Sequence, residues 1–280
     1  MAGGGANLAW SLPAGAPVWR HGLCGLAQPR LEPPQHTPRF LFHEATLVLV
    51  VAGRLQLEDG SSGSAVVAES PTSLPLVQPA TCAELVKTPG GAEQRFRSVL
   101  LTLSADLPEA FHRIRPPAEV EAAAAPAFRQ MPWDGDLAAS LRHVVDGAAN
   151  VRISDERLRY RLMDLLAALA ERGHLFRAER QGTSGRLRTL IGEAPGRHWT
   201  ARGAGRARAM SEATPRRRLA QEHVRVDVLL VDIRMHHALM LVQTTSWSVL
   251  RTVPACGYQS RARFAERFRA RFGYLPSTVR

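Results

Sequence analysis

The segment at residues 260–273 constrains the fold of the chain end, because its large apolar residues recur at one fixed spacing. Phenylalanine stands at every fourth position, at Phe264, Phe268 and Phe272. Side chains four residues apart lie on one face of an α-helix. Ser260 is a favourable N-cap and Gly273 a favourable residue to end the helix. The segment therefore predicts a short helix that packs down on an aromatic stripe.

Arginines recur with the same period beside this stripe, at Arg263, Arg267 and Arg271. We expect this guanidinium row to point outward on the neighbouring face. Such a row can neutralise phosphates and donate paired hydrogen bonds to guanine O6 and N7 in a major groove. The alternative is a solvated cationic surface. A preceding short helix that ends near Gly257, followed by a tight turn, favours a helix-turn-helix.

The basic charge of the chain is one-sided. Residues 186–280 hold 18 arginines, no lysine and 6 acidic residues, whereas the whole chain has a net charge of +11. The rest of the chain is thus close to neutral. A basic module joined to a neutral one is typical of nucleic-acid-binding proteins.

Two different kinds of secondary structure divide the chain. Residues 40–103 contain short apolar runs separated by Pro and Gly, which predict strands of a small barrel or sandwich. Helical patterns begin near Asp106, and the clearest one runs from the cap Ser154 to Gly173. Its buried stripe is expected at Leu158, Leu162, Leu165, Leu166 and Leu169.

The polar segment 179–186 is the expected linker, which leaves an N-terminal domain over 1–178 and a C-terminal domain over 187–280. The C-terminal domain is predicted to contain helices and no strands. Its longest helix starts near Val226, with a buried side at Val228, Leu229, Met235, Leu239 and Val242.

The histidines and cysteines give no metal or cofactor signature. His36 and His43 are seven residues apart and lack the tight His-x-His and Glu spacing of a metal-binding cupin. We therefore expect no metal, no cofactor and no enzyme activity. The scattered Cys24, Cys82 and Cys256 predict buried reduced thiols in a cytoplasmic protein. No apolar run approaches the ~18 residues that a membrane span needs.

The end of the chain, GYQSRARFAERFRARFGYLPSTVR, resembles the C-terminal signature of the AraC/XylS family of transcription regulators. The matching residues are Gly257, Tyr258, Ser260, Phe264, Phe268, Arg269, Gly273, Pro276 and Arg280. The similarity continues upstream through WTARGAGRARAMSEATPRRRL, which resembles the first helix-turn-helix of the family. It also includes RMHHALMLVQTTSW, which resembles the linker helix and the run into the second motif.

The resemblance implies an α+β protein with a cupin-like N-terminal β-barrel and helices, which senses an effector and dimerises. It also implies an all-α C-terminal domain with two helix-turn-helix motifs. Such a homodimer would bind promoter DNA, respond to a small molecule or partner, act in the cytoplasm and position RNA polymerase. The alternative is a degraded, cupin-like ligand-binding or interaction protein that does not bind DNA.

The resemblance also implies which residues contact DNA. In the first motif these are Ala213, Arg216 and Arg217. In the second they are Ala262, Arg263 and Glu266, with Arg261 and Arg267 nearby. An alanine can offer only its methyl group, for contact with thymine, so the arginines are expected to carry most of the base reading.

Several residues depart from the pattern of the family. With Ser211 as the cap, Pro215 would interrupt the first recognition helix, whereas with Thr214 as the cap it would occupy the favoured first position. Pro254 is expected to disturb the helix before the second turn by removing a hydrogen bond to the Leu250 carbonyl. The opening helix of the first motif is weakened by Gly203, Gly205 and Arg208.

Overall fold

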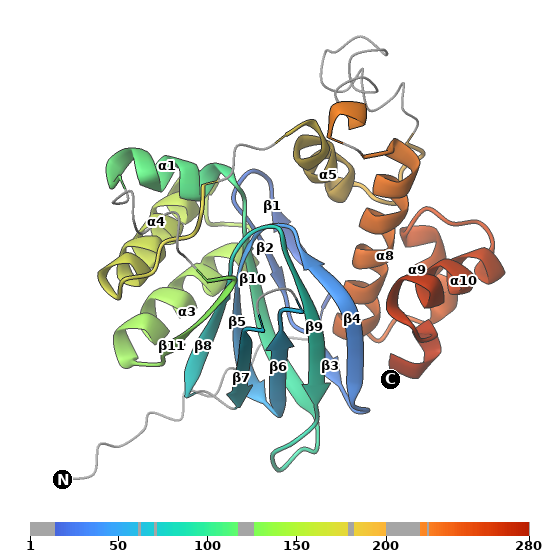
Figure 1. Ribbon diagram of the computed structural model, residues 1–280, viewed down its shortest axis with the longest axis horizontal. Coiled ribbons are helices and arrows are strands. Elements are labelled where there is room, and N and C mark those ends of the chain that lie inside the picture. Colours follow the sequence, from blue (N-terminus) through green and yellow to red (C-terminus); the bar gives the residue numbers. More distant parts are fainter. Residues whose placement is uncertain are drawn as a thin grey trace. The chain divides into compact units, whose positions relative to one another are not determined.

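The computed structural model describes residues 15–60, 63–69, 72–116, 126–178, 182–199, 219–222 and 224–279. The chain divides into two compact units, Met1–Ala178 and Glu179–Arg280. The described part of the first unit is rich in strands and has three helices, and the described part of the second is helical (Figure 1). No helix in these described ranges is both long enough and apolar enough to cross a membrane.

Seven strands of the first unit form one antiparallel sheet. They are β1 (Val18–Arg20), β2 (Cys24–Ala27), β3 (Arg30–Leu31), β5 (Ala45–Ala52), β8 (Ser73–Val77), β10 (Phe96–Leu103) and β11 (Phe128–Pro132). Their order is β1-β2-β10-β5-β8-β11, and β3 also pairs with β10. The sequence predicts strands over residues 40–103, so it does not anticipate β1, β2, β3 and β11.

A second antiparallel sheet has four strands, β4 (Gln35–Phe42), β6 (Arg54–Glu58), β7 (Ala65–Glu69) and β9 (Thr81–Thr88), in the order β4-β9-β6-β7. Among the described strands the two sheets stay separate, so the closed cupin-like barrel expected from the sequence is not observed. The strand pairing is the reason, because no described strand of one sheet pairs with a strand of the other. Gly53, with a φ of +81°, makes one of the crossings between the sheets, from β5 into β6. A Cβ at this position would lie 2.4 Å from the Thr88 carbonyl oxygen.

Helices α1 (Asp106–Ile114), α3 (Gly135–Ala149) and α4 (Asp155–Glu171) complete the first unit and lie along one side of the seven-stranded sheet (Figure 1). Ser154 caps α4 by accepting a hydrogen bond from the Arg157 amide, as predicted. The predicted leucine stripe is also confirmed, since all five members are at most 4% exposed. These leucines join strand residues such as Leu47 and Leu101 in one apolar core.

The described helices of the second unit are α5 (Thr183–Glu193), α8 (Val226–Thr244), α9 (Val249–Ala255) and α10 (Arg261–Phe272), followed by the 3-10 turn η1 (Pro276–Val279). Helix α5 thus begins inside the segment that the sequence indicates as a linker. The predicted buried side of α8 is correct except at Val228, which is 59% exposed. Ile233 is buried on α8 instead, at 5% exposure.

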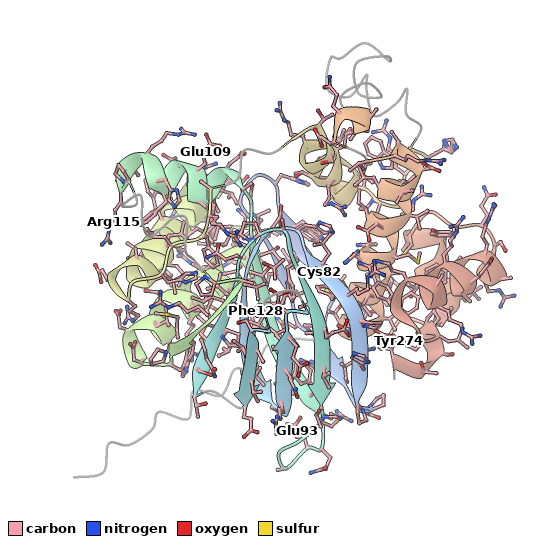
Figure 2. All side chains as sticks on the ribbon, viewed as in Figure 1. Cys82, Glu93, Glu109, Arg115, Phe128 and Tyr274 are labelled. Atoms are coloured by element: carbon pink, nitrogen blue, oxygen red, sulfur yellow. The ribbon has the colours of Figure 1, made fainter. Side chains whose placement is uncertain are left out.

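The three cysteines are all free thiols, but they do not share one environment. Cys24 and Cys256 are buried, and burial raises the pKa of each thiol to about 12. Cys82 is exposed on β9 (Figure 2), so the expectation that all three thiols are buried is wrong for this residue. Alternation along the strand is the reason, because Thr81 and Ala83 on either side of Cys82 face inward.

Lys87, the only lysine of the chain, is buried on β9 with 6% of its surface exposed. It lies opposite Gln35 of β4 and Leu55 of β6, and its Nζ is 5.7 Å from the centre of the Phe96 ring. Burial lowers the pKa of the Lys87 amine to about 7, because desolvation disfavours the charged form. The first unit therefore holds an amine that titrates near neutral pH inside its fold.

Replacing Lys87 with methionine should raise the stability of the protein at pH 7 and weaken its dependence on pH. In the wild type, the unfolded chain binds the extra proton between the folded pKa of about 7 and the unfolded pKa of ~10.4, so stability rises with pH in this window. The expected slope is on the order of 1 kcal/mol per pH unit. Urea unfolding at pH 7, 8 and 9 measures it.

The control for this prediction is Arg115→Met, which removes a positive charge from an exposed position of the same unit (Figure 2). It should keep the wild-type slope. Equal slopes for wild type and Lys87→Met would show that the lysine is protonated alike in the folded and unfolded chains.

Candidate DNA-binding surface

Capping residues set the geometry of the turn between α9 and α10. The Ser248 and Ser260 hydroxyls accept hydrogen bonds from the Arg251 and Arg263 amides, each at 3.3 Å, at the starts of the two helices. Gly257 turns the chain between them with a φ of +74°. Gly273 ends α10 with a φ of +86°, and its amide donates to the Arg269 carbonyl. The predicted beginning and end of the last helix are thus confirmed.

The three phenylalanines of α10 form its buried side. Phe264, Phe268 and Phe272 have no exposed surface, and successive ring centres lie 6.0 and 4.9 Å apart. The Tyr258 ring packs edge-on against Phe264 at 5.6 Å, and the ring of Tyr274, labelled in Figure 2, lies 5.9 Å from that of Phe268. Each buried phenylalanine contributes about 2 kcal/mol by removing apolar surface from water. This packing fixes which side of α10 faces outward.

The predicted contact residues of the second motif lie on the exposed part of α10, as Arg261, Ala262, Arg263, Glu266 and Arg267 are all exposed. Arg269 is exposed as well. Within the described ranges, no ion pair engages the guanidinium groups of Arg261, Arg263, Arg267 and Arg269. Several cations on a rigid, capped helix can therefore meet an anionic partner such as a phosphate backbone.

Arg271 does not continue the outward row, contrary to the sequence prediction. Its Nε lies 2.9 Å from Asp232 Oδ1 of α8, and its side chain is 20% exposed. Residues four apart advance by about 40° around a helix of 3.6 residues per turn. The row that starts outward at Arg263 therefore approaches the buried side by Arg271.

Helix α9 continues through Pro254, contrary to the expected disturbance. Val253 stays helical and is 3% exposed. Pro254 is the next-to-last residue of the helix, so the hydrogen bonds that follow it close the helix end normally. The Cys256 amide donates to Thr252, the Gly257 amide to Pro254 and the Tyr258 amide to Val253. The proline thus removes a single hydrogen bond near a helix end.

The predicted contact residues of the first motif, Ala213, Arg216 and Arg217, lie outside the described residues. The doubtful positions Gly203, Gly205, Arg208 and Pro215 lie outside them too. The flanks of this segment are described and are both anchored. Trp199 and Leu219 are buried in one apolar cluster, together with Leu187, Ile191, Leu229 and Ile233.

Glu222, just after the first motif, caps α5 across 39 residues of sequence. Its Oε1 accepts from the Thr183 amide at 2.5 Å and its Oε2 from the Ser184 amide at 2.9 Å. Burial acts to raise the pKa of Glu222, but the hydrogen bonds from Ser184 and Thr183 outweigh it and lower the pKa. The sequence does not predict this contact. Gly182 at the N-cap position of α5 has no side chain to cap the helix, but nothing local indicates that the cap comes from Glu222.

The expectation of no metal site in the first unit remains a prediction. His36, one of the two histidines considered as ligands, lies on the surface with its Nε2 2.7 Å from Glu84 Oε2. Such an exposed pair contributes little to stability.

Comparison with known proteins agrees with this geometry. The helix-turn-helix domain family matches residues 185–280. Residues 185–280 therefore form an AraC-type helix-turn-helix domain. The transcriptional regulator YdeO of Escherichia coli K12 is 31% identical over 96 residues, and the E. coli urease operon transcriptional activator is 32% identical over 91 residues. These matches cover 34% and 32% of this chain, and only 38% and 31% of the length of those two proteins.

Solved structures extend the likeness of fold to most of the chain. A crystal structure of ToxT from Vibrio cholerae O395 covers 91% of this chain and 95% of its own, with a TM-score of 0.56 and 14% identity. An apo ToxT variant from strain SCE256 gives a TM-score of 0.60 at 12% identity, covering 92% of this chain and 97% of its own. The chain thus combines a sheet-rich N-terminal domain with its AraC-type helical domain in a ToxT-like fold.

Replacing Glu222 with glutamine should destabilise the AraC-type domain by about 1–2 kcal/mol, because the buried amides of α5 lose a charged cap. The pKa of Glu222 is lowered in the folded state, so its contribution is full above pH ~4.3 and is lost as the pH falls through the folded value. Urea unfolding at pH 7 and pH 4 measures the difference. The exposed Glu156→Gln in the first unit is the control, and equal losses at both pH values would contradict the prediction.

Proposed function

We propose that this chain is a sequence-specific DNA-binding transcription regulator and not an enzyme. Its AraC-type domain would place two recognition helices in successive major-groove segments of a promoter. The observation that carries the proposal is the exposed arginine row of α10 on a helix held by three fully buried phenylalanines. Matching of residues 185–280 to a helix-turn-helix family supports it.

The proposed reading residues have distinct roles. Arg263 and Arg267 would contact guanine edges, Arg261 the phosphates, and the Ala262 methyl group a thymine, with Glu266 able to accept from a cytosine amino group. In the first motif, Ala213, Arg216 and Arg217 are proposed to act in the same way by resemblance to the family.

The sheet-rich unit is proposed to sense a small effector or partner and to mediate homodimerisation. One ToxT structure is described as bound to an unsaturated fatty acid, which supports effector binding in a fold of this kind. We place the proposed regulator in the cytoplasm, where it would position RNA polymerase. A role as activator is favoured because the urease operon relative is named as one.

Replacing Arg263 with alanine should abolish most of the preference for a selected DNA site while leaving weak binding to random DNA. The experiment selects genomic fragments with the purified chain and then measures affinity for the selected and a scrambled site across salt concentrations. Loss of one guanine contact should reduce the preference by about 5- to 150-fold. Arg159→Ala, an exposed arginine of the first unit, is the matched control and should behave like wild type.

The same experiment separates the two interpretations of the sequence. A regulator shows a steep salt dependence together with a sequence preference. Wild-type protein that binds every sequence equally would contradict the proposed function and favour a ligand-binding protein whose helical part mediates other contacts.

A further inference from the structure

Helix α8 carries two charged residues, Asp232 and Arg234. Each of them contacts residues that come before α8 in the sequence and residues that come after it. Asp232 is 19% exposed and has two arginine partners. Its Oδ2 accepts from Arg188 Nη1 of α5 and its Oδ1 from Arg271 Nε of α10, both at 2.9 Å. His236 Nδ1, one turn along α8, lies 3.3 Å from the same Oδ1. One carboxylate thus joins the first helix of the unit to the last.

Arg234 makes a second connection. Its Nε and Nη2 donate to the carbonyls of Pro195 and Arg197 in the segment after α5, each at 3.1 Å. Its guanidinium also lies over the Tyr258 ring at 5.8 Å. A Cβ at Gly257 would approach Arg234 Nη2 to 2.7 Å, so the glycine of the second turn admits the guanidinium.

One apolar cluster of the helical unit ends next to these two residues. The cluster around Leu187, Ile191 and Trp199 draws its α8 members from the first part of the helix, ending at Ile233. It includes no residue of α9 or α10. Asp232 and Arg234 therefore lie where the core of the first half ends and α8 meets the second half.

Such contacts are stronger and more directional than surface ion pairs. The side chains of Arg188, Asp232 and Arg271 are each about one-fifth exposed, which limits the screening of their charges by solvent. Two guanidinium groups on opposite oxygens also fix the direction of each partner relative to α8. Removing the shared charge leaves two arginines on a surface that is largely shielded from water.

We propose that Asp232 and Arg234 form a clamp that sets the distance and angle between the two helix-turn-helix halves, and hence the spacing of DNA segments that the domain accepts. This inference rests on the proposed function. Successive major-groove segments on one side of DNA are about 34 Å apart. With the clamp intact, the domain binds DNA well at one spacing of the two contacted segments. Without the clamp, it binds at several spacings with similar affinity.

The test uses the full-length chain and a series of DNA sites built from the selected site. The segment between the two contacted parts is lengthened or shortened by one or two base pairs. Wild type should lose about tenfold or more in affinity when the spacing changes by one base pair. Asp232→Asn keeps the size of the side chain and removes its charge, and its loss at the same step should fall to about threefold or less.

The control is Glu222→Gln, which weakens the same unit without joining its two halves. It should lower affinity at every spacing by a similar factor and keep the wild-type optimum. If Asp232→Asn does not fold, Arg188→Gln takes its place, because it cuts one arm and leaves Asp232 bound to Arg271.

The possible outcomes test the proposed function and the clamp separately. Wild-type protein without any preferred site contradicts the proposed function itself. A wild type with a sharp optimum and an Asp232→Asn variant with the same sharp optimum contradict the clamp alone. A flattened spacing profile in a folded Asp232→Asn variant supports the clamp.

Discussion

Burial of three phenylalanines on one side of α10 determines what the rest of the helical unit can present to a partner. Because Phe264, Phe268 and Phe272 are fully buried, Arg267 and Arg269 between them are exposed. Arg271 is the exception, because it pairs with Asp232 of α8. The serine cap and the glycine end hold the helix in place at both termini. The apolar packing of α10 therefore leaves Arg261, Arg263, Arg267 and Arg269 on the exposed part of the helix.

The parts of this unit that sequence reasoning predicted correctly depend on local rules. Caps, helix ends and the aromatic stripe follow from residues within one segment, and they appear in the structure where expected. The sequence prediction is wrong for Arg271, whose partner Asp232 lies on another helix, and for Val228, which lies in the first turn of α8. Asp232 gave no signal in the sequence, since its partners Arg188 and Arg271 are 44 and 39 residues away.

The sheet-rich unit shows a similar division between local and distant effects. Alternating apolar residues identified most strands, but the pairing of those strands was not encoded locally. Among the described strands none of one sheet pairs with a strand of the other, so two sheets form where the sequence predicts a closed barrel. Gly53 makes one of the crossings between them. Lys87 was noticeable only as the single lysine of an arginine-rich chain, and its burial beside Phe96 emerges from the pairing of β9 with β4 and β6.

Two helix-turn-helix halves, joined through α8, are proposed to contact DNA as one unit. Methylation interference on the selected site tests this most directly, because it reports guanine N7 contacts in the major groove. The account predicts two groups of interfering guanines on the same side of the duplex, about one helical turn apart. A single group, or none, would contradict it.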